Sequence, residues 1–254
     1  GLPAEIDVRQ KQYEYYRDLL LTFAETGKII AQTDRQTDRQ TELSAIKLIQ
    51  YVFGYAQVEL KDVCLSIKDG MHNLPQNSLN QGTHPIISAQ NILNGSIDFK
   101  AKRYVDEKTF LEEKRRTKIS QGDVLLTIVA TIGRTAIVQN KTDFLLQRSV
   151  CVLKPTEIVD SRYLKYWLDS KNIQDYMITN AHGSAQAGLY LNQVQTIQII
   201  LPTLQGQKKI ADLLDRYHKY CYDIDIGLPA EIEVRKKQYE YYRDKLLTFK
   251  KLEE

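Results

Sequence analysis

The sequence predicts a globular domain of mixed α/β (α+β) structure between two long α-helical arms. Three observations lead to this expectation. Apolar residues alternate at spacings of four and three, the pattern of a helix that packs against another helix, in residues 1–23 and again in residues 227–249. Short apolar runs separated by turn residues, typical of strands, fill residues 51–203. Helical spacing returns after Pro202. The expected organisation is therefore a helical spacer region at 1–50, a central domain at 51–203 and a second helical spacer region at 204–254.

The two terminal segments are near copies of each other. They differ at three positions only, the pairs Asp7/Glu233, Gln10/Lys236 and Leu19/Lys245. Their apolar seams consist of Leu2, Ile6, Tyr13, Tyr16 and Leu20 in the first copy, and of Leu228, Ile232, Tyr239, Tyr242 and Leu246 in the second. A single copy has the alternative interpretation of an ordinary amphipathic surface helix. The duplication favours two helices that each seek a helical partner.

A tetrapeptide repeat follows the first copy. Residues 33–36 and 37–40 both read Thr-Asp-Arg-Gln, and a partial third unit begins at Thr41. A low-complexity linker is one interpretation. A polar helical spacer is the other, because Gln and Arg are good helix formers and each unit would add about 6 Å of helix. As a helix, the repeat would act as a ruler between the elements on either side.

The central domain is expected to hold strands at 85–89, 123–129, 135–139 and 146–153, and helices at 160–169 and 171–179. Turn residues such as Gly122 and Gly133 separate the predicted strands. Beyond Pro202 the helical pattern continues to about residue 224. Gly227 and Pro229 then predict a break between two helices, because Gly suits a helix end and Pro a first turn.

Composition excludes several classes of protein. The formal net charge of +3 is too small to prove a polyanionic partner. Three cysteines, Cys64, Cys151 and Cys221, are far apart and form no C-x-x-C motif, which argues against a disulfide framework or a thiolate zinc site. The sequence has no run of 18 apolar residues and no signal-peptide pattern. We therefore expect a cytoplasmic protein without a membrane partner.

Motifs of catalysis are also missing. The chain has no Gly-rich cofactor loop that opens a helix, no ATP-binding P-loop and no Asn-Pro-Pro-Tyr type tetrapeptide of adenine methyltransferases. Its four histidines, His72, His84, His182 and His218, have no metal-ligand spacing with one another or with the cysteines, and are expected in turns, on the surface and in the arm. The expectation is a chain without catalytic residues, cofactors or metal.

Several segments resemble the specificity subunit of type I restriction–modification enzymes. The resemblance is carried by the paired terminal copies, the tetrapeptides, the stretch GSAQAGLYLNQVQTIQIILP at 183–202 and the stretch LPTLQGQKKIADLLD at 201–215. It covers essentially the whole chain. Thr203 and Gly206 stand where the family usually has a second Pro and an acidic residue. The resemblance implies two target-recognition domains in a full subunit, each followed by a helical spacer, with the two spacers packed as an antiparallel coiled coil. This sequence has one such domain between two spacer copies and therefore resembles half of a specificity subunit.

The candidate phosphate contacts lie in a basic segment. Residues 100–118 contain eight basic and four acidic residues, an excess suited to phosphates, although a solvated helix face explains the interleaved acids almost as well. Its predicted DNA contacts are Lys114, Arg115, Arg116 and Lys118. Lys68, before the Asp69-Gly70 turn, is a further candidate, although plain turn chemistry also explains that loop.

Base reading requires bidentate side chains at rigid strand ends, Arg toward guanine and Asn or Gln toward adenine. The candidates are Gln90, Asn91, Arg134, Gln147, Arg148, Ser184 and Gln186. Arg148 allows two interpretations, because an Arg beside Val150 and Val152 either pairs with a carboxylate in the core or lines a DNA cleft.

Partners follow from the resemblance. It implies double-stranded DNA, two methyltransferase subunits and, through them, the restriction subunit. One head and two near-identical seams further predict a homodimer that reads a symmetric, interrupted site. A coiled-coil adaptor whose head binds protein is the alternative function, and a helix pair within one chain is the alternative to the dimer.

Overall fold

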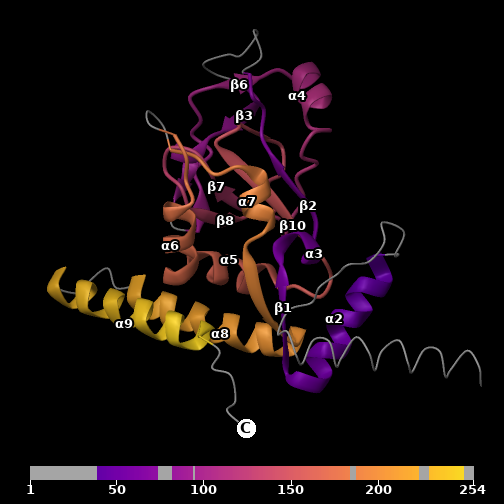
Figure 1. Cartoon of the computed structure of the whole chain (residues 1–254). Helices are drawn as coiled ribbons and strands as arrows, with labels where there is room; N and C mark the ends of the chain where they lie inside the picture. The colour runs from indigo at the N-terminus through magenta and orange to yellow at the C-terminus, as the bar shows by residue number, and fades with distance from the viewer. Residues whose placement is uncertain (1–38, 74–81, 94, 184–186, 223–228, 249–254) are drawn as a thin grey trace, which may run out of the picture.

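A computed structural model describes residues 39–73, 82–93, 95–183, 187–222 and 229–248 (Figure 1). The terminal copy at residues 1–23, with Leu2, Ile6, Tyr13, Tyr16 and Leu20, lies outside these residues, as do most of the tetrapeptides. No helix in the described part is long and apolar enough to cross a membrane.

The head is built on an antiparallel sheet in the order β2 (Cys64–Asp69), β10 (Val150–Pro155), β7 (Val124–Thr127) and β8 (Thr135–Ile137). Its central strands are buried on both faces, which explains why they read as continuous apolar runs. Leu126 and Leu153 contribute to the larger core, which lies between the sheet and the helices on that face. Leu125 and Val152 pack with Phe144 on the opposite face. The period of two residues thus divides the sheet between two cores.

A smaller layer covers the second face of this sheet. Here β3 (His84–Ile87) pairs in parallel with β9 (Leu145–Leu146) and in antiparallel with β6 (Tyr104–Val105). The short helix η1 (Ala89–Asn91), the hairpin of β4 (Ile92–Leu93) and β5 (Ser96–Ile97), and α4 (Glu107–Glu113) complete the layer. Of this layer, β3, β6 and α4 form the end of the head that is farthest from the helices α8 (Leu204–Tyr222) and α9 (Pro229–Leu247) (Figure 1).

The two ends of the head meet in a two-stranded sheet. β1 (Tyr55–Glu59) pairs with β11 (Gln198–Pro202) in antiparallel register, next to α3 (Leu60–Val63) and α7 (Leu191–Gln195). The preceding helix α2 (Arg39–Phe53) buries Leu43, Ile46 and Ile49 in the larger core. Both arms therefore leave the head from the same region, which meets the geometric condition for helix pairing within one chain.

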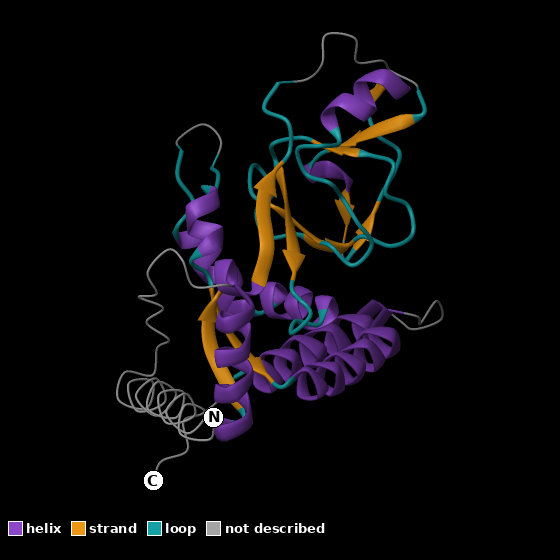
Figure 2. Cartoon of the chain, turned by 90° about the vertical axis from the view of Figure 1, so that its right-hand side faces the viewer, coloured by secondary structure: helices purple, strands orange, loops and turns teal. Residues whose placement is uncertain are grey.

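Two pairs of helices lie in layers beneath the sheet, and the lower pair, α8 and α9, forms the arm. α5 (Ser161–Asp169) and α6 (Lys171–Thr179) lie beneath the sheet, and α8 (Leu204–Tyr222) and α9 (Pro229–Leu247) lie side by side beneath them (Figures 1 and 2). Tyr239 and Leu247 of α9 are buried in the larger core, and the carboxylate of Asp244 accepts a hydrogen bond of 3.1 Å from the backbone N–H of Lys171 at the start of α6. The second terminal copy, which forms α9, thus packs against the head of the same chain.

Most sequence expectations for these elements are confirmed. The predicted strands at 85–89, 123–129 and 135–139 correspond to β3, β7 and β8, and the two predicted helices to α5 and α6. The break before residue 229 is also confirmed, because α8 ends at Tyr222 and α9 begins with Pro229 in its first turn. Of the second seam, Tyr239 is buried, Leu246 is partly buried and Tyr242 is 42% exposed. Leu228 and the side chain of Ile232 lie outside the described part.

The single strand expected at 146–153 is wrong, because two strands, β9 and β10, occupy this segment. The backbone N–H of Arg148 donates to the carbonyl oxygen of Met71 (2.8 Å), and the N–H of Val150 turns back to the carbonyl oxygen of Gln147 (2.9 Å). This turn moves the chain from the smaller layer into the main sheet. The sequence did not show it, because the residues on both sides are equally apolar.

Candidate nucleic-acid interface

A polar edge forms at the turn between β9 and β10, where three predicted base-reading residues come together: Gln90, Gln147 and Arg148. The N–H of Gln147 donates to the carbonyl oxygen of Ile87 (2.8 Å), and the N–H of Ala89 donates to the Ser149 hydroxyl (3.1 Å). These bonds hold the turn against the end of β3, directly before Gln90. Gln90 and Arg148 are exposed and Gln147 is half-buried. The exposed position of Arg148 excludes the interpretation as a buried core arginine.

Asn91 belongs to the protein interior instead. It is 7% exposed, and its side-chain amide donates to the carbonyl oxygens of Asp98 (3.0 Å) and Lys100 (3.3 Å). Its carbonyl oxygen accepts from the N–H and the hydroxyl of Ser88. The predicted base contact of Asn91 is inconsistent with this position, because both halves of the amide are used to shape the loop beside Gln90. Sequence alone cannot separate two adjacent amides when only one of them points into the core.

The basic turn after α4 carries the predicted phosphate contacts. Lys114, Arg115, Arg116 and Lys118 are all exposed, and Lys118 adopts a left-handed conformation with φ of 47°. Arg116 forms an ion pair of 2.8 Å with Asp69 at the end of β2, which offsets part of its charge. The same carboxylate accepts from the His72 ring (2.7 Å). Lys68, which precedes Asp69, is exposed as expected.

The basic turn and the polar edge are joined through the end of β2. Arg116 contacts Asp69, and two residues later the carbonyl oxygen of Met71 accepts from the N–H of Arg148. An ion pair on one side and a backbone hydrogen bond on the other therefore connect the predicted phosphate contacts to the predicted base contacts. This arrangement suits a polyanion whose backbone and bases are read at neighbouring positions.

Arg134 lies on a different edge, next to the arm. It is exposed and borders an open groove of about 530 Å³ between the head and α9. The groove is lined by the cations Arg134, Lys165, Lys171, Lys236 and Arg243 and by the anions Asp169, Glu240 and Asp244. Ion pairs join Lys165 to Asp169 (2.8 Å) and Arg243 to Asp244 (2.9 Å). Much of the groove's charge is therefore compensated within the protein.

The loop that contains Ser184 and Gln186 is described only at its base. His182 and Gly188 exchange two backbone hydrogen bonds of 2.9 Å, and the N–H of Ala130 donates to the carbonyl oxygen of Ala187 (3.2 Å). Ser184 and Gln186 themselves lie outside the described residues. Beside the base, the His182 ring stacks on Tyr190, with ring centroids 5.9 Å apart and Tyr190 64% exposed. The sequence analysis did not single out Tyr190, which lies in the 183–202 motif.

His84 corrects the expectation that the histidines lie in turns, on the surface and in the arm. The residue is 8% exposed at the start of β3, and its ring stacks on that of Phe110, with ring centroids 4.0 Å apart. One ring nitrogen contacts Glu107 (2.7 Å) and the other the carbonyl oxygen of Asp143 (3.3 Å). The histidine therefore ties α4 to the smaller layer. No group of three or more potential metal ligands occurs among the described residues.

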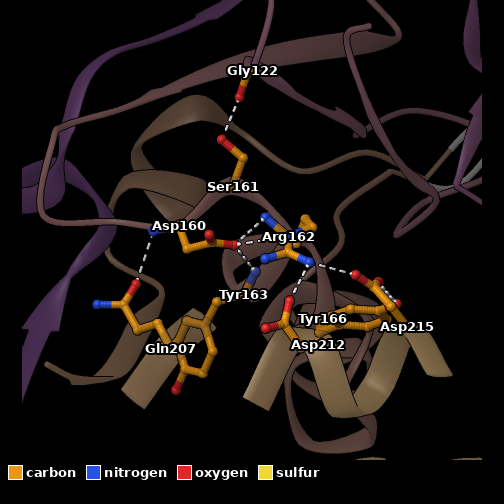
Figure 3. A network of polar contacts seen from close by, with 9 residues as sticks. All are labelled: Gly122, Asp160, Ser161, Arg162, Tyr163, Tyr166, Gln207, Asp212 and Asp215. Atoms are coloured by element: carbon orange, nitrogen blue, oxygen red, sulfur yellow. Dashed lines mark hydrogen bonds and ion pairs between the residues drawn. The ribbon is translucent and has the colours of Figure 1, made fainter. Parts of the chain in front are cut away.

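A polar network joins the head to the arm at the contact of α5 with α8 (Figure 3). One terminal nitrogen of Arg162 donates to Asp212 (2.7 Å) and to Asp215 (2.6 Å), and the Tyr166 hydroxyl donates to the other oxygen of Asp215 (2.5 Å). Behind them, the fully buried Gln207 accepts from the N–H of Asp160 (2.9 Å). Ser161 donates to the carbonyl oxygen of Gly122 (2.6 Å), which connects the start of α5 to the turn before β7.

The network has defined protonation states. Burial lowers the pKa of Arg162, but the hydrogen bonds to Asp212 and Asp215 outweigh this effect and raise its pKa overall, so the guanidinium stays charged. Burial, together with the hydrogen bond to Asp215, raises the pKa of Tyr166, so its hydroxyl remains a donor.

Cys64, which lies outside this network, has a free thiol whose pKa burial raises to about 12. That cysteine is therefore not a ready nucleophile.

Comparison with known proteins agrees with this architecture. A putative type I restriction enzyme specificity subunit from Haemophilus influenzae is 28% identical over 244 residues, which cover 95% of this chain and 53% of the relative. The specificity subunit of a type I restriction enzyme from Escherichia coli is 25% identical, with coverage of 99% and 56%. The chain thus spans about half the length of these curated relatives.

The fold and a family model give the same result. A solved structure described as the basis of assembly and conformational transition of a type I restriction–modification system superimposes with a TM-score of 0.51 at 16% identity, over 97% of this chain and 56% of that one. The family model described as the type I restriction modification DNA specificity domain matches residues 54–234, from the end of α2 into α9. The chain therefore belongs to the family of type I restriction–modification DNA specificity domains.

Proposed function

We propose that this chain reads one half of a bipartite DNA site and docks the methyltransferase subunits of a type I restriction–modification enzyme. The observation that carries the proposal is the polar edge, where hydrogen bonds of the backbone hold the β9–β10 turn, with Gln147 and the exposed Arg148, against the end of β3 beside the exposed Gln90. Arg and Gln are the side chains that pair with guanine and adenine edges through two hydrogen bonds. A rigid base lowers the entropy cost of aligning them.

The basic turn supports the same assignment. Lys114, Arg115 and Lys118 are exposed in the turn that Arg116 connects to the end of β2, whereas Arg116 itself is partly neutralised by Asp69. Phosphate contacts fix the register of a protein on a duplex without reading its sequence. In the proposal these cations position the DNA and the polar edge reads it.

No catalytic step is assigned to the chain. In the proposed complex the methyltransferase partner flips and methylates adenine with its own cofactor, and the restriction subunit joins through that complex. The near-identical copies on either side of the head support a second chain as the source of the second head. Two heads related by a two-fold axis then read a symmetric, interrupted site.

Methylome sequencing of cells that carry the chain with its methyltransferase subunit tests the function. The expected result is adenine methylation at an interrupted motif with two identical half-sites in inverted orientation, because both heads have the same sequence. An uninterrupted motif, or no motif above the level of cells that lack the chain, would contradict the proposal. In the second case, the absence of salt-sensitive duplex binding would favour the protein-binding adaptor.

At the polar edge, loss of Arg148 is expected to affect DNA binding, whereas loss of Asn91 is expected to affect folding stability. Arg148→Ala is expected to weaken binding to the methylated motif by about 1–3 kcal/mol and to relax base preference at one position, with an unchanged midpoint of urea unfolding. Asn91→Ala is the matched control, since it leaves the carbonyl oxygens of Asp98 and Lys100 without their donor and is expected to cost about 1–3 kcal/mol of unfolding free energy. Fluorescence anisotropy and urea titration measure the two quantities. An Arg148→Ala protein with lowered stability and unaltered base preference would contradict the assignment.

The tetrapeptide predicts a change of distance only. Deletion of residues 37–40 leaves residues 33–36, with the same four letters, directly before Thr41. The gap between half-sites is expected to shorten while the methylated bases stay the same, since a helical insert changes distance and rotation but not the heads. Methylome sequencing of the deletion variant provides the measurement. Altered half-site bases with the original gap would refute the ruler hypothesis.

The predicted homodimer has a direct competitor in the pairing of β1 with β11, which places both arms at one end of the head. Light scattering of the full chain at micromolar concentration is expected to give the mass of two chains. Tyr242→Asp, at a position of α9 that is 42% exposed, is expected to shift the mass toward one chain. Lys237→Asp, at an exposed position of the same helix, controls for the added carboxylate. A folded monomer of the unaltered chain would show that the helices pair within one chain.

A further inference from the structure

We infer that Arg162, with Tyr166, Asp212 and Asp215, fixes the angle of the head on the arm and thereby sets how strictly the gap between half-sites is read. These four residues act as positioning residues that touch neither bases nor phosphates in this assignment. The inference rests on the proposed function, because a gap has meaning only for a protein that reads two half-sites.

Apolar contacts alone do not determine this angle. α5 buries Tyr163, Leu164 and Leu168 in the larger core, and α8 contributes Ala211 and Leu214 to it. Hydrophobic burial is non-directional, so an apolar contact tolerates small rotations and shifts of one helix on another. A charge-assisted hydrogen bond requires a defined position of both partners. Together with the hydrogen bond from the N–H of Asp160 to Gln207, the network of Arg162 therefore distinguishes one angle of α8 on α5 from its neighbours.

The two aspartates lie one turn apart on α8, a spacing at which like charges repel. Arg162 contacts both of them at 2.7 Å and 2.6 Å, and Tyr166 donates to Asp215 from a side chain that is only 4% exposed. A rotation of α8 would move at least one aspartate out of reach and restore the repulsion. Figure 3 shows Arg162 between the two aspartates, with Tyr166 bonded to Asp215, so these polar partners are all satisfied at the observed angle of α8.

The network is connected to the DNA-reading side of the head through α5. The residue before Arg162, Ser161, is bonded to Gly122, and Asp169 at the end of α5 accepts from the Thr135 hydroxyl in β8 (2.6 Å). Both contacts tie α5 to the β7–β8 hairpin, which belongs to the same sheet as β10. α5 therefore moves with the sheet. A rotation of the head relative to the arm would change the contact of α5 with α8, and the ion pairs of Arg162 oppose that rotation.

A gap altered by one base pair displaces the second half-site by about 3.4 Å and rotates it by about 35°. A head held at one angle tolerates such a change poorly. When the ion pairs are lost, both heads of the complex gain rotational freedom, and sites with the wrong gap become accessible. The half-site bases are unaffected, because Gln90 and Arg148 do not contact this network.

The test compares methylomes of cells that carry the full chain and its methyltransferase subunit. Arg162→Met keeps the aliphatic stem and removes the charge, and Arg162→Lys keeps the charge on a more compact group. Lys209→Met, at an exposed position of α8, is the control for loss of one positive charge. In Arg162→Met, methylation at sites with a gap changed by one base pair, relative to the original gap, is expected to rise about tenfold, which corresponds to about 1.4 kcal/mol. Arg162→Lys should give a smaller rise and Lys209→Met none.

The outcomes separate this inference from the proposed function. If the unaltered chain directs methylation at an interrupted site and Arg162→Met keeps the strict gap, the inference fails and the proposed function stands. If the unaltered chain directs no methylation, both fail. If Arg162→Met abolishes methylation, Asp212→Asn decides, because this carboxylate is 55% exposed and is not needed for the core. A relaxed gap in Asp212→Asn supports the inference, and a strict gap overturns it.

Discussion

The arrangement of this molecule depends on one backbone oxygen, the carbonyl of Pro202, which accepts hydrogen bonds from two buried glutamines. Gln50 at the end of α2 and Gln207 near the start of α8 each donate to it from their side-chain amides at 2.8 Å. Gln50 also donates to Leu201 (3.1 Å) and Gln207 to Ile158 (2.9 Å). A carbonyl oxygen has two lone pairs, so both bonds form at once. Each arm is thereby fixed to the same point of the head.

This shared point explains why the head can orient two helical arms although its own ends are short strands. The β1–β11 pair has two strands only, and such a pair is weak by itself. Here α2 precedes β1 in the chain and α8 follows β11. Both helices bury apolar side chains in the larger core and so support the strand pair. Unpaired carbonyls at this depth would destabilise the junction, since a buried acceptor without a partner costs about 1–3 kcal/mol. The glutamines remove that cost and make the position of the arms specific.

The two ends of the head then have different roles. Near the arms, side-chain contacts are directional: Gln207 bonds at 0% exposure, and the partly exposed Arg162 lies between two aspartates. At the polar edge, Arg148 and Gln90 are exposed while their backbones are held by hydrogen bonds. A rigid backbone with exposed side chains suits recognition of a ligand. Side chains whose hydrogen bonds are all made within the protein suit a contact that fixes the position of the head on the arm. The sheet between these regions is buried on both faces and connects them as one body.

The sequence by itself determined the family, the break before Pro229, three of the strands and both helices beneath the sheet, because apolar period, turn residues and repeated segments are local properties of the chain. It also identified Gln90, Gln147 and Arg148 as candidate base-reading residues, and left open whether Arg148 lies in the core. Only the tertiary structure decided that Asn91 turns inward, that residues 146–153 form two strands, and that Arg148 lies outside the core. Each of these depends on contacts beyond the next few residues, such as Met71 for Arg148, 77 positions away, or Asp98 for Asn91, across a loop of seven positions. The junction of Arg162 with Asp212 and Asp215 is of the same kind, because residues 50 and 53 positions apart become neighbours only after the head packs on the arm.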